Sequence, residues 1–167
     1  MFIDESGAKT NMTRLRGRAL KGGRAHDSAP LCRWTVRTMI SSIRLDGSKA
    51  CMTIDAPTDG AVFQAFTEQV LVPALRPGDV VVMDNLGAHR REEIAAAIAR
   101  AGARAEYLPA YSPDLNPIEK MWSKVKEFLR AAKARTSDAL DAAIEAAFQS
   151  ATPQNAASWF ASCGYTI

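Results

Sequence analysis

The sequence is short of cysteine and contains no long apolar run. Its three cysteines, Cys32, Cys51 and Cys163, form no CxxC pair, which disfavours a disulfide framework or a zinc site and suits a reducing compartment. No apolar stretch approaches the roughly 20 residues that span a bilayer, and the N-terminus lacks the basic and apolar regions of a signal peptide. We therefore expect a cytoplasmic protein without a membrane partner, whose cysteines are thiols in or near the core.

Internal repeats and low-complexity linkers are also missing, so nothing in the sequence divides the 167 residues into two domains. Hydrophobic residues make up 47% of the chain. That fraction is enough for a full core and argues against disorder. We expect one domain that covers residues 1–167.

Acidic and basic residues nearly balance, with a net charge of +3, but they are distributed unevenly. Residues 6–37 contain eight Lys or Arg and one acid, and residues 120–135 contain six and one. Residues 136–167 contain three acids and no Lys or Arg. Two basic stretches indicate a local surface for a polyanion, although ordinary solvated charge gives the same pattern.

Hydrophobic periodicity divides the chain into strands and helices. Residues 1–5, 34–45, 50–54, 80–84 and 103–108 have strand patterns, and residues 61–75, 91–101, 117–134, 137–150 and 153–160 have helical ones. Asp46-Gly47 is typical of a hairpin turn, Thr58 or Asp59 caps the first helix, and residues 18–25 form either a short strand or a loop. The order predicts an α/β fold, in which a mixed sheet of three antiparallel and two parallel strands is flanked by helices.

Three carboxylates fall at the ends of these elements. Asp4 and Asp84 each end an apolar strand, and Glu119 lies in the first turn of a helix, with 34 residues between it and Asp84. In open α/β sheets, ligands bind at the carboxyl ends of the strands. Neighbouring strands lie about 4.8 Å apart, so the two aspartates could hold one divalent ion and Glu119 could complete a two-metal site for phosphoryl transfer.

Each carboxylate also has a purely structural explanation. Asn116-Pro-Ile-Glu119 matches a helix capping box, Asp84 could merely end its strand in a turn, and Asp4 could be solvated near the terminus. None of these explanations accounts for the matching positions of all three at one edge of the predicted sheet.

Two segments carry a resemblance to a known family. The segments 83–89, Met-Asp-Asn-Leu-Gly-Ala-His, and 111–119, Tyr-Ser-Pro-Asp-Leu-Asn-Pro-Ile-Glu, together with the strand that ends Asp4-Glu5, resemble the mariner-like DDE transposases of bacterial insertion sequences. The resemblance implies a ribonuclease-H-like fold and a catalytic triad of Asp4, Asp84 and Glu119 that binds two Mg²⁺ or Mn²⁺ ions. It further implies cutting at transposon ends, strand transfer to target DNA, and a location in the bacterial cytoplasm beside the nucleoid.

Such transposases also carry an N-terminal helix-turn-helix region that recognises the transposon ends. This sequence starts at the first catalytic strand, so we expect a catalytic domain without that region, acting as a homodimer or with a separately encoded recognition subunit. Two other interpretations remain open. In the first, the chain is a truncated, non-catalytic remnant that binds either DNA or a transposase. In the second, it is a ribonuclease-H-type nuclease.

Several basic side chains are candidates for contact with DNA. The candidates share a position in a basic stretch or near a carboxylate: Arg14, Arg16, Arg18, His89, Arg90, Lys120 and Lys124. For His89 the alternative is an ordinary surface or capping residue, and for the lysines it is a solvated helix face.

Overall fold

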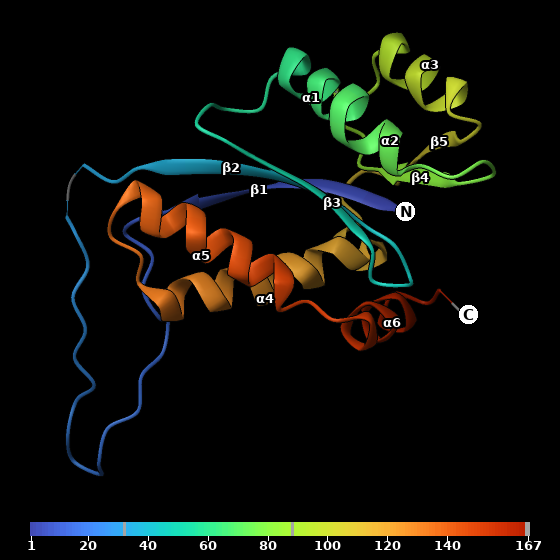
Figure 1. The fold of residues 1–167 in the computed structure, drawn as a ribbon. Helices are drawn as coiled ribbons and strands as arrows, with labels where there is room; N and C mark the ends of the chain where they lie inside the picture. Colours follow the sequence, from blue (N-terminus) through green and yellow to red (C-terminus); the bar gives the residue numbers. More distant parts are fainter. Residues whose placement is uncertain (32, 88, 166–167) are drawn as a thin grey trace.

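The computed structural model describes residues 1–31, 33–87 and 89–165 and has a five-stranded sheet at its centre (Figure 1). The strands are β1 Phe2–Lys9, β2 Val36–Ile43, β3 Lys49–Ile54, β4 Val80–Met83 and β5 Arg104–Tyr107. They lie in the order β3-β2-β1-β4-β5. β1, β2 and β3 pair antiparallel, whereas β4 is parallel to both β1 and β5. The mixed five-stranded sheet predicted from the sequence is confirmed.

Helices cover both faces of this sheet, as Figure 1 shows. One layer holds α1 Gly60–Phe66, a π-helical turn Thr67–Leu71, α2 Val72–Ala74 and α3 Glu92–Arg100. The other holds α4 Pro117–Ala132, α5 Ser137–Gln149 and α6 Pro153–Ser162. Among the described residues, no helix is long and apolar enough to cross a membrane.

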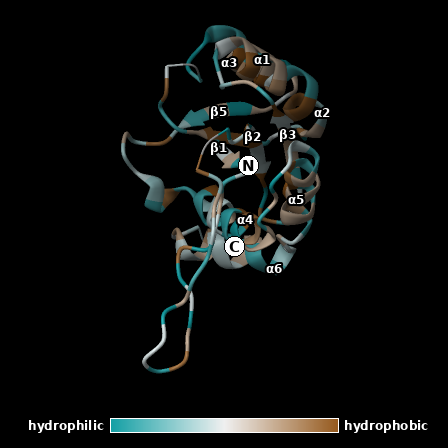
Figure 2. Ribbon diagram, turned by 90° about the vertical axis from the view of Figure 1, so that its left-hand side faces the viewer, coloured by the Kyte–Doolittle hydropathy of each residue, from teal (hydrophilic) through white to brown (hydrophobic). Residues whose placement is uncertain are grey.

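The alternation of side chains along β1 builds two separate cores. Phe2 packs with Trp122 and the other apolar residues of α4, α5 and α6. Ile3 points to the opposite face and packs with Phe63 and the residues of the α1–α3 layer. Figure 2 shows the same division, with α1, α2 and α3 on one side of the strands and α4, α5 and α6 on the other. Since successive residues of a strand face opposite sides, Asp4 shares the α4 face with Phe2.

The predicted turns form where their residues require them. Asp46 accepts hydrogen bonds from Ser48 in the hairpin between β2 and β3, and Gly47 has a φ of +83°, a conformation that glycine adopts at little cost. Asp59, one of the two predicted caps, accepts from the backbone N–H groups of Ala61 and Val62 at the start of α1.

In the N-terminal third one expectation is wrong, and of the two alternatives for residues 18–25 the loop is correct. β1 continues to Lys9 instead of ending at Glu5, because the antiparallel ladder to β2 runs on through Lys9↔Val36. Residues 18–25 form no strand. They contain Gly22 and Gly23, which make a turn there, and they have no neighbouring strand edge to supply hydrogen bonds.

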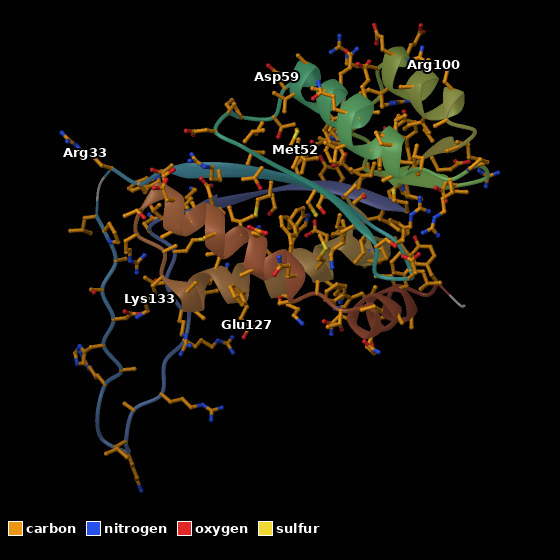
Figure 3. All side chains as sticks on the ribbon, in the orientation of Figure 1. Arg33, Met52, Asp59, Arg100, Glu127 and Lys133 are labelled. Atoms are coloured by element: carbon orange, nitrogen blue, oxygen red, sulfur yellow. The ribbon has the colours of Figure 1, made fainter. Side chains whose placement is uncertain are left out.

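The basic arm, defined as residues 11–31 and 33–35, leaves the body of the molecule as an extended excursion (Figures 1 and 2). Its base is held at the end of α4, because Arg135 donates to the carbonyls of Thr10 and Met12. Lys133 lies 2.6 Å from Asp27 of the arm, and Figure 3 shows Lys133 beside it. The cysteines lie elsewhere. Cys51 is half-buried and Cys163 is buried, both as free thiols, whereas Cys32 is outside the described residues.

Candidate active site

One cavity of about 360 Å³ lies at the carboxyl ends of β4 and β5, beside Asp4 near the start of β1 and beside the start of α4. Asp4, Asp84 and Glu119 all line it. Three segments that are far apart in the sequence therefore bring the three predicted carboxylates to one place. The same cavity has an apolar rim that includes Leu86 and Tyr111, both of which are exposed.

Asp4 is the most deeply placed of the three. The indole Nε1–H of Trp122 donates to Asp4 Oδ2 at 3.0 Å, which fixes the carboxylate against α4. Burial raises the pKa of Asp4 to about 7, and the nearby negative charge of Glu119 adds to the increase. An apolar environment and like charges both disfavour the ionised form. Asp4 is thus a carboxylate that lacks a compensating cation, and it is not the solvated group that its position near the terminus suggested.

Asp84 has a cationic partner. His89 Nδ1 lies 2.5 Å from Asp84 Oδ1. Burial opposes ionisation of Asp84, but the contact with His89 outweighs it, so the pKa of Asp84 lies below its usual value. Asp84 Oδ1 also accepts from the backbone N–H of Leu86 at 3.2 Å. The alternative that Asp84 ends its strand in a turn is therefore correct, and this role coexists with its place in the cavity.

His89 is neither a surface residue nor a helix cap, and that alternative is wrong. Its side chain is 1% exposed, and its ring stacks at 4.1 Å from that of Phe63. Its Nε2 lies 2.9 Å from Glu5 Oε1, on the strand next to that of Asp84. Burial by itself would lower the pKa of His89, but the bonds to Asp84 and Glu5 raise it to about 9. Placed this way, the ring joins two strands and is not directed at a DNA phosphate.

Glu119 does not form the predicted capping box. Asn116 occupies the N-cap position of α4, but its side chain makes no capping hydrogen bond. The backbone N–H of Glu119 donates to the carbonyl of Asn116 at 3.1 Å, and among the described residues its side chain does not reach back to cap the helix. The exposed Glu119 carboxylate is consequently free to face the cavity. The capping-box explanation for this residue is wrong, because Pro117 already starts the helix without a side-chain cap.

The donor set suits a divalent metal ion. Carboxylate and carbonyl oxygens are the ligands that Mg²⁺ and Mn²⁺ prefer, and a cation would offset the burial and the neighbouring negative charges that raise the pKa of Asp4. Within the described ranges, however, no three His, Cys, Asp or Glu side chains are arranged to hold one ion. The carboxylates share a cavity without converging on a point, and the exposed Glu119 side chain would have to turn inward to join the aspartates.

The basic candidates are spread over two surfaces. Arg14 and Arg16 are exposed on the basic arm and line a cavity of about 650 Å³ with Ser123 and Glu127 of α4. Since Glu119, Ser123 and Glu127 are spaced by four residues, they follow one face of α4. That face connects the arm to the carboxylate cavity.

The remaining candidates differ in how free they are. Arg18, Arg90 and Lys120 are exposed. Lys124 is half-buried, and its ammonium donates to Asn155 Oδ1 at 2.6 Å, so it is engaged with α6.

Sequence reasoning did not identify the roles of three residues. Glu5 and Trp122 position His89 and Asp4, and Tyr111 stands fully exposed at the rim with a φ of +58°. A positive φ in a tyrosine is uncommon and indicates a segment held by its surroundings. The flanking prolines of the motif at 109–117 were the available signal for Tyr111. Nothing in the sequence indicated that Glu5 and Asp84 would share one histidine.

Comparison with known proteins gives one family and one fold. The family model described as DDE superfamily endonuclease matches residues 1–141. No curated protein matches the chain. Among solved structures, the Mos1 strand transfer complex matches with a TM-score of 0.72 at 16% sequence identity, covering 96% of this chain and 50% of that one.

Two further Mos1 structures agree. The Mos1 mariner paired-end complex with Mn has a TM-score of 0.70 at 14% identity, covering 96% of this chain and 51% of that one. The catalytic domain of Mos1 mariner transposase has a TM-score of 0.50 at 13% identity, covering 80% of this chain and 76% of that one. The chain spans about half the length of the first of these relatives. At these identities the likeness establishes the fold, which is ribonuclease-H-like.

Proposed function

The chain belongs to the DDE superfamily endonucleases, and from this premise we propose that residues 1–167 are the catalytic domain of a DNA transposase. It would cut DNA at transposon ends and join the cut strand to target DNA. The observation that carries the proposal is the cavity shared by Asp4, Asp84 and Glu119. These carboxylates come from two parallel strands and the following helix, at the edge of the sheet where α/β proteins bind ligands.

In this proposal Asp4, Asp84 and Glu119 hold two Mg²⁺ or Mn²⁺ ions. Such ions, when bound, activate a water or a 3′-hydroxyl and stabilise the leaving oxygen of a phosphodiester. The chain supplies the positions of the ligands. Trp122 keeps Asp4 oriented through its indole N–H, and His89 keeps Asp84 beside β1. Glu119 provides the exposed carboxylate that completes the set of three metal ligands.

DNA would reach the cavity along α4. Arg14, Arg16 and Arg18 are exposed on the basic arm, and the arm meets the helix face that leads to Glu119. Lysine and arginine contacts to phosphates position DNA but carry little sequence information. In this proposal, a helix-turn-helix region or a separate subunit recognises the transposon ends. A homodimer brings the two ends together.

The decisive experiment replaces Glu119 with Gln. Glu119→Gln removes a charge without removing a capping bond, so the fold should persist while Mg²⁺-dependent nicking of a plasmid that carries the flanking inverted repeats is lost. Glu145→Gln, an exposed glutamate on α5 outside the carboxylate cavity, is the matched control and should nick normally. Normal nicking by Glu119→Gln would refute the catalytic assignment. Faster cleavage of an RNA–DNA hybrid than of the repeat-bearing duplex would point to a ribonuclease H instead.

A second candidate function is a non-catalytic remnant that binds DNA or a full-length transposase. This candidate is favoured because, in the part of the chain that the structure describes, Asp4, Asp84 and Glu119 are not arranged to share one ion. Ligand binding to the folded state raises the midpoint of thermal unfolding. Titration with Mn²⁺ therefore separates the two candidates: a rising midpoint supports the catalytic domain, and a constant one supports the remnant.

The route of the DNA is tested by salt dependence. Each phosphate contact that is lost reduces the slope of log K against log salt by roughly 0.9 for duplex DNA. Replacing Arg14, Arg16 and Arg18 by Gln together should therefore flatten the slope by up to about three units. The matched control changes Arg100 and Arg104, which lie on α3 and β5 away from the arm, and should leave the slope unchanged.

A further inference from the structure

Asn116 carries a buried hydrogen-bond acceptor that the described chain leaves without a partner. Its side chain is 4% exposed, and Oδ1 receives no hydrogen bond from any residue in the ranges 1–31, 33–87 and 89–165. Buried polar side chains in folded proteins nearly always have a partner. The exception at Asn116 therefore needs an explanation.

Helix capping does not provide one. Asn116 stands at the N-cap of α4 but makes no side-chain cap bond. The corresponding residues of three other helices do: Asp59 accepts from Val62, Thr136 from Ala139 and Thr152 from Asn155. The N-cap position usually favours asparagine because its oxygen accepts from the first helical turn. At α4 that oxygen is not used for the helix.

The location of Asn116 suggests another use. The residue lines the cavity that Asp4, Asp84 and Glu119 share. Amide oxygens bind hard divalent cations and the water molecules around them. An amide also adds no negative charge, so it supplies an oxygen donor without adding to the charge of the three carboxylates in the cavity.

We propose that Asn116 is a positioning residue of the metal site, whose Oδ1 helps to hold a divalent cation by accepting a hydrogen bond from one of its water molecules. This inference rests on the proposed function, because it takes the three carboxylates as the principal ligands. It adds a neutral fourth group from the same turn as Glu119. The orphaned acceptor then gains its partner only when the cation is bound.

The test measures Mn²⁺ binding by calorimetry and, separately, thermal unfolding of the metal-free protein, on the full chain. Asn116→Leu removes the acceptor and keeps the approximate volume. It should weaken Mn²⁺ binding by about 10- to 100-fold, as loss of an outer-shell partner does at other metal sites. The metal-free midpoint should stay equal or rise, because an unsatisfied buried acceptor is replaced by an apolar group. Asn116→Asp keeps the oxygen and should bind Mn²⁺ at least as tightly as the natural chain.

The control is Thr152→Ala, which removes a genuine cap bond and should lower the metal-free midpoint while leaving Mn²⁺ binding unchanged. The inference fails if Asn116→Leu binds Mn²⁺ normally, or if it unfolds like Thr152→Ala. It also fails if Asn116→Asp loses binding as Asn116→Leu does. The proposed function fails separately, and with it this inference, if Glu119→Gln binds Mn²⁺ as well as the natural chain or if the natural chain binds none.

Discussion

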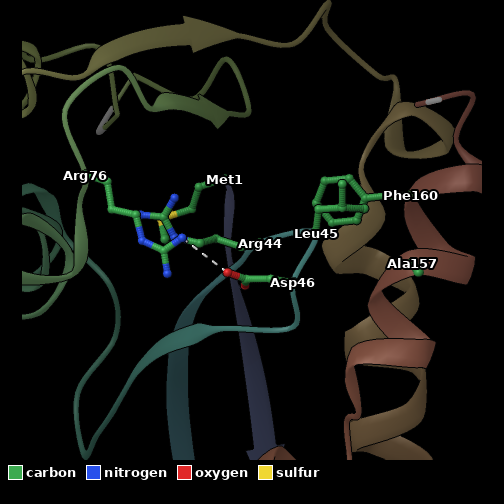
Figure 4. A pocket seen from close by; sticks show the side chains of 7 residues that line it. All are labelled: Met1, Arg44, Leu45, Asp46, Arg76, Ala157 and Phe160. Atoms are coloured by element: carbon green, nitrogen blue, oxygen red, sulfur yellow. Dashed lines mark ion pairs between the residues drawn. The ribbon is translucent and has the colours of Figure 1, made fainter. Parts of the chain in front are cut away.

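Asp79, just before β4, and Asp4, on β1 beside the carboxyl end of β4, are in opposite electrostatic conditions. At the amino end, Asp79 pairs with Arg44 at 2.5 Å, and this partner lowers the pKa of Asp79 to about 2. At the carboxyl end, Asp84 has His89 as its partner, but Asp4 in the same cavity has no ion pair within the described residues, and burial raises its pKa to about 7. Figure 4 shows Arg44 at the amino end, with Arg76 paired to Asp46. One edge of the sheet has its charges neutralised, whereas the other retains uncompensated negative charge.

This difference separates a structural cluster from a functional one. Paired carboxylates stabilise the fold at neutral pH, while clustered carboxylates without a cation destabilise it. A site that costs stability is the kind that persists for binding or catalysis. The comparison therefore supports the carboxyl end of β4, and not the amino end, as the functional edge.

The largest effect should come from Asp4→Asn. Because the folded-state pKa of Asp4 is about 7, above its ordinary 3.8, ionisation of Asp4 opposes folding and stability falls as pH rises from 4 to 7. At about 1.4 kcal/mol per unit, Asp4→Asn should raise the free energy of unfolding at pH 8 by about 4 kcal/mol and change little at pH 4. Urea unfolding of the metal-free protein at both pH values measures this. Equal effects at pH 4 and pH 8 would contradict it.

The next largest effect on stability should come from replacing His89, whose ring pairs with Asp84 and Glu5. Its folded-state pKa of about 9 lies above the ordinary 6.5, so its contribution is complete below pH 6.5 and is lost as pH rises through 9. His89→Phe keeps the packing on Phe63 but cannot carry charge, and it should lower the free energy of unfolding by about 3 kcal/mol at pH 6. Urea titrations at pH 6 and pH 10 should show the deficit shrinking. A deficit that is constant with pH would mean that packing, and not charge, is responsible.

At the amino end the sign reverses. The folded-state pKa of Asp79 is about 2, below 3.8, so its contribution is present above pH 3.8 and is lost as pH falls through 2. Asp79→Asn, which retains an acceptor for the backbone N–H of Arg76, should cost about 2 kcal/mol at pH 7. The natural and variant proteins should converge in stability near pH 2. Convergence at pH 7 would show that Arg44 and Asp79 do not interact effectively.

The smallest effect is expected from the exposed ion pair of Arg76 and Asp46, beside Arg44. Arg76 and Asp46 lie 3.3 Å apart with side chains 65% and 47% exposed. Exposed ion pairs contribute about 0–1 kcal/mol. Arg76→Met should therefore change the thermal midpoint by no more than about 4 °C. A loss as large as that of Asp79→Asn would mean that the amino edge works as one network.

Prediction from sequence succeeded where the pattern is local. The strand 80–84, the helix 117–134 and the hairpin at Asp46-Gly47 were predicted from periodicity and turn residues, and the structure places each within a few residues. Prediction was weaker for β1, because its length is set by the ladder to β2 and not by its own residues. The basic arm also has no periodicity of its own, so neither a strand nor its direction could be inferred.

The candidate site divides along the same line. The sequence by itself determined which residue types were present, namely two aspartates in or next to strands and a glutamate in the first turn of a helix, and its motifs identified the family. Only the tertiary structure decided how deeply these side chains are buried and which hydrogen-bond partners they have. It buried Asp4 against Trp122, gave Asp84 a histidine shared with Glu5, and left the Asn116 oxygen without a cap bond. Hydrogen-bond partners and desolvation depend on residues that are distant in the chain. Both set the pKa values of the side chains and decide which of them remain available to bind a ligand.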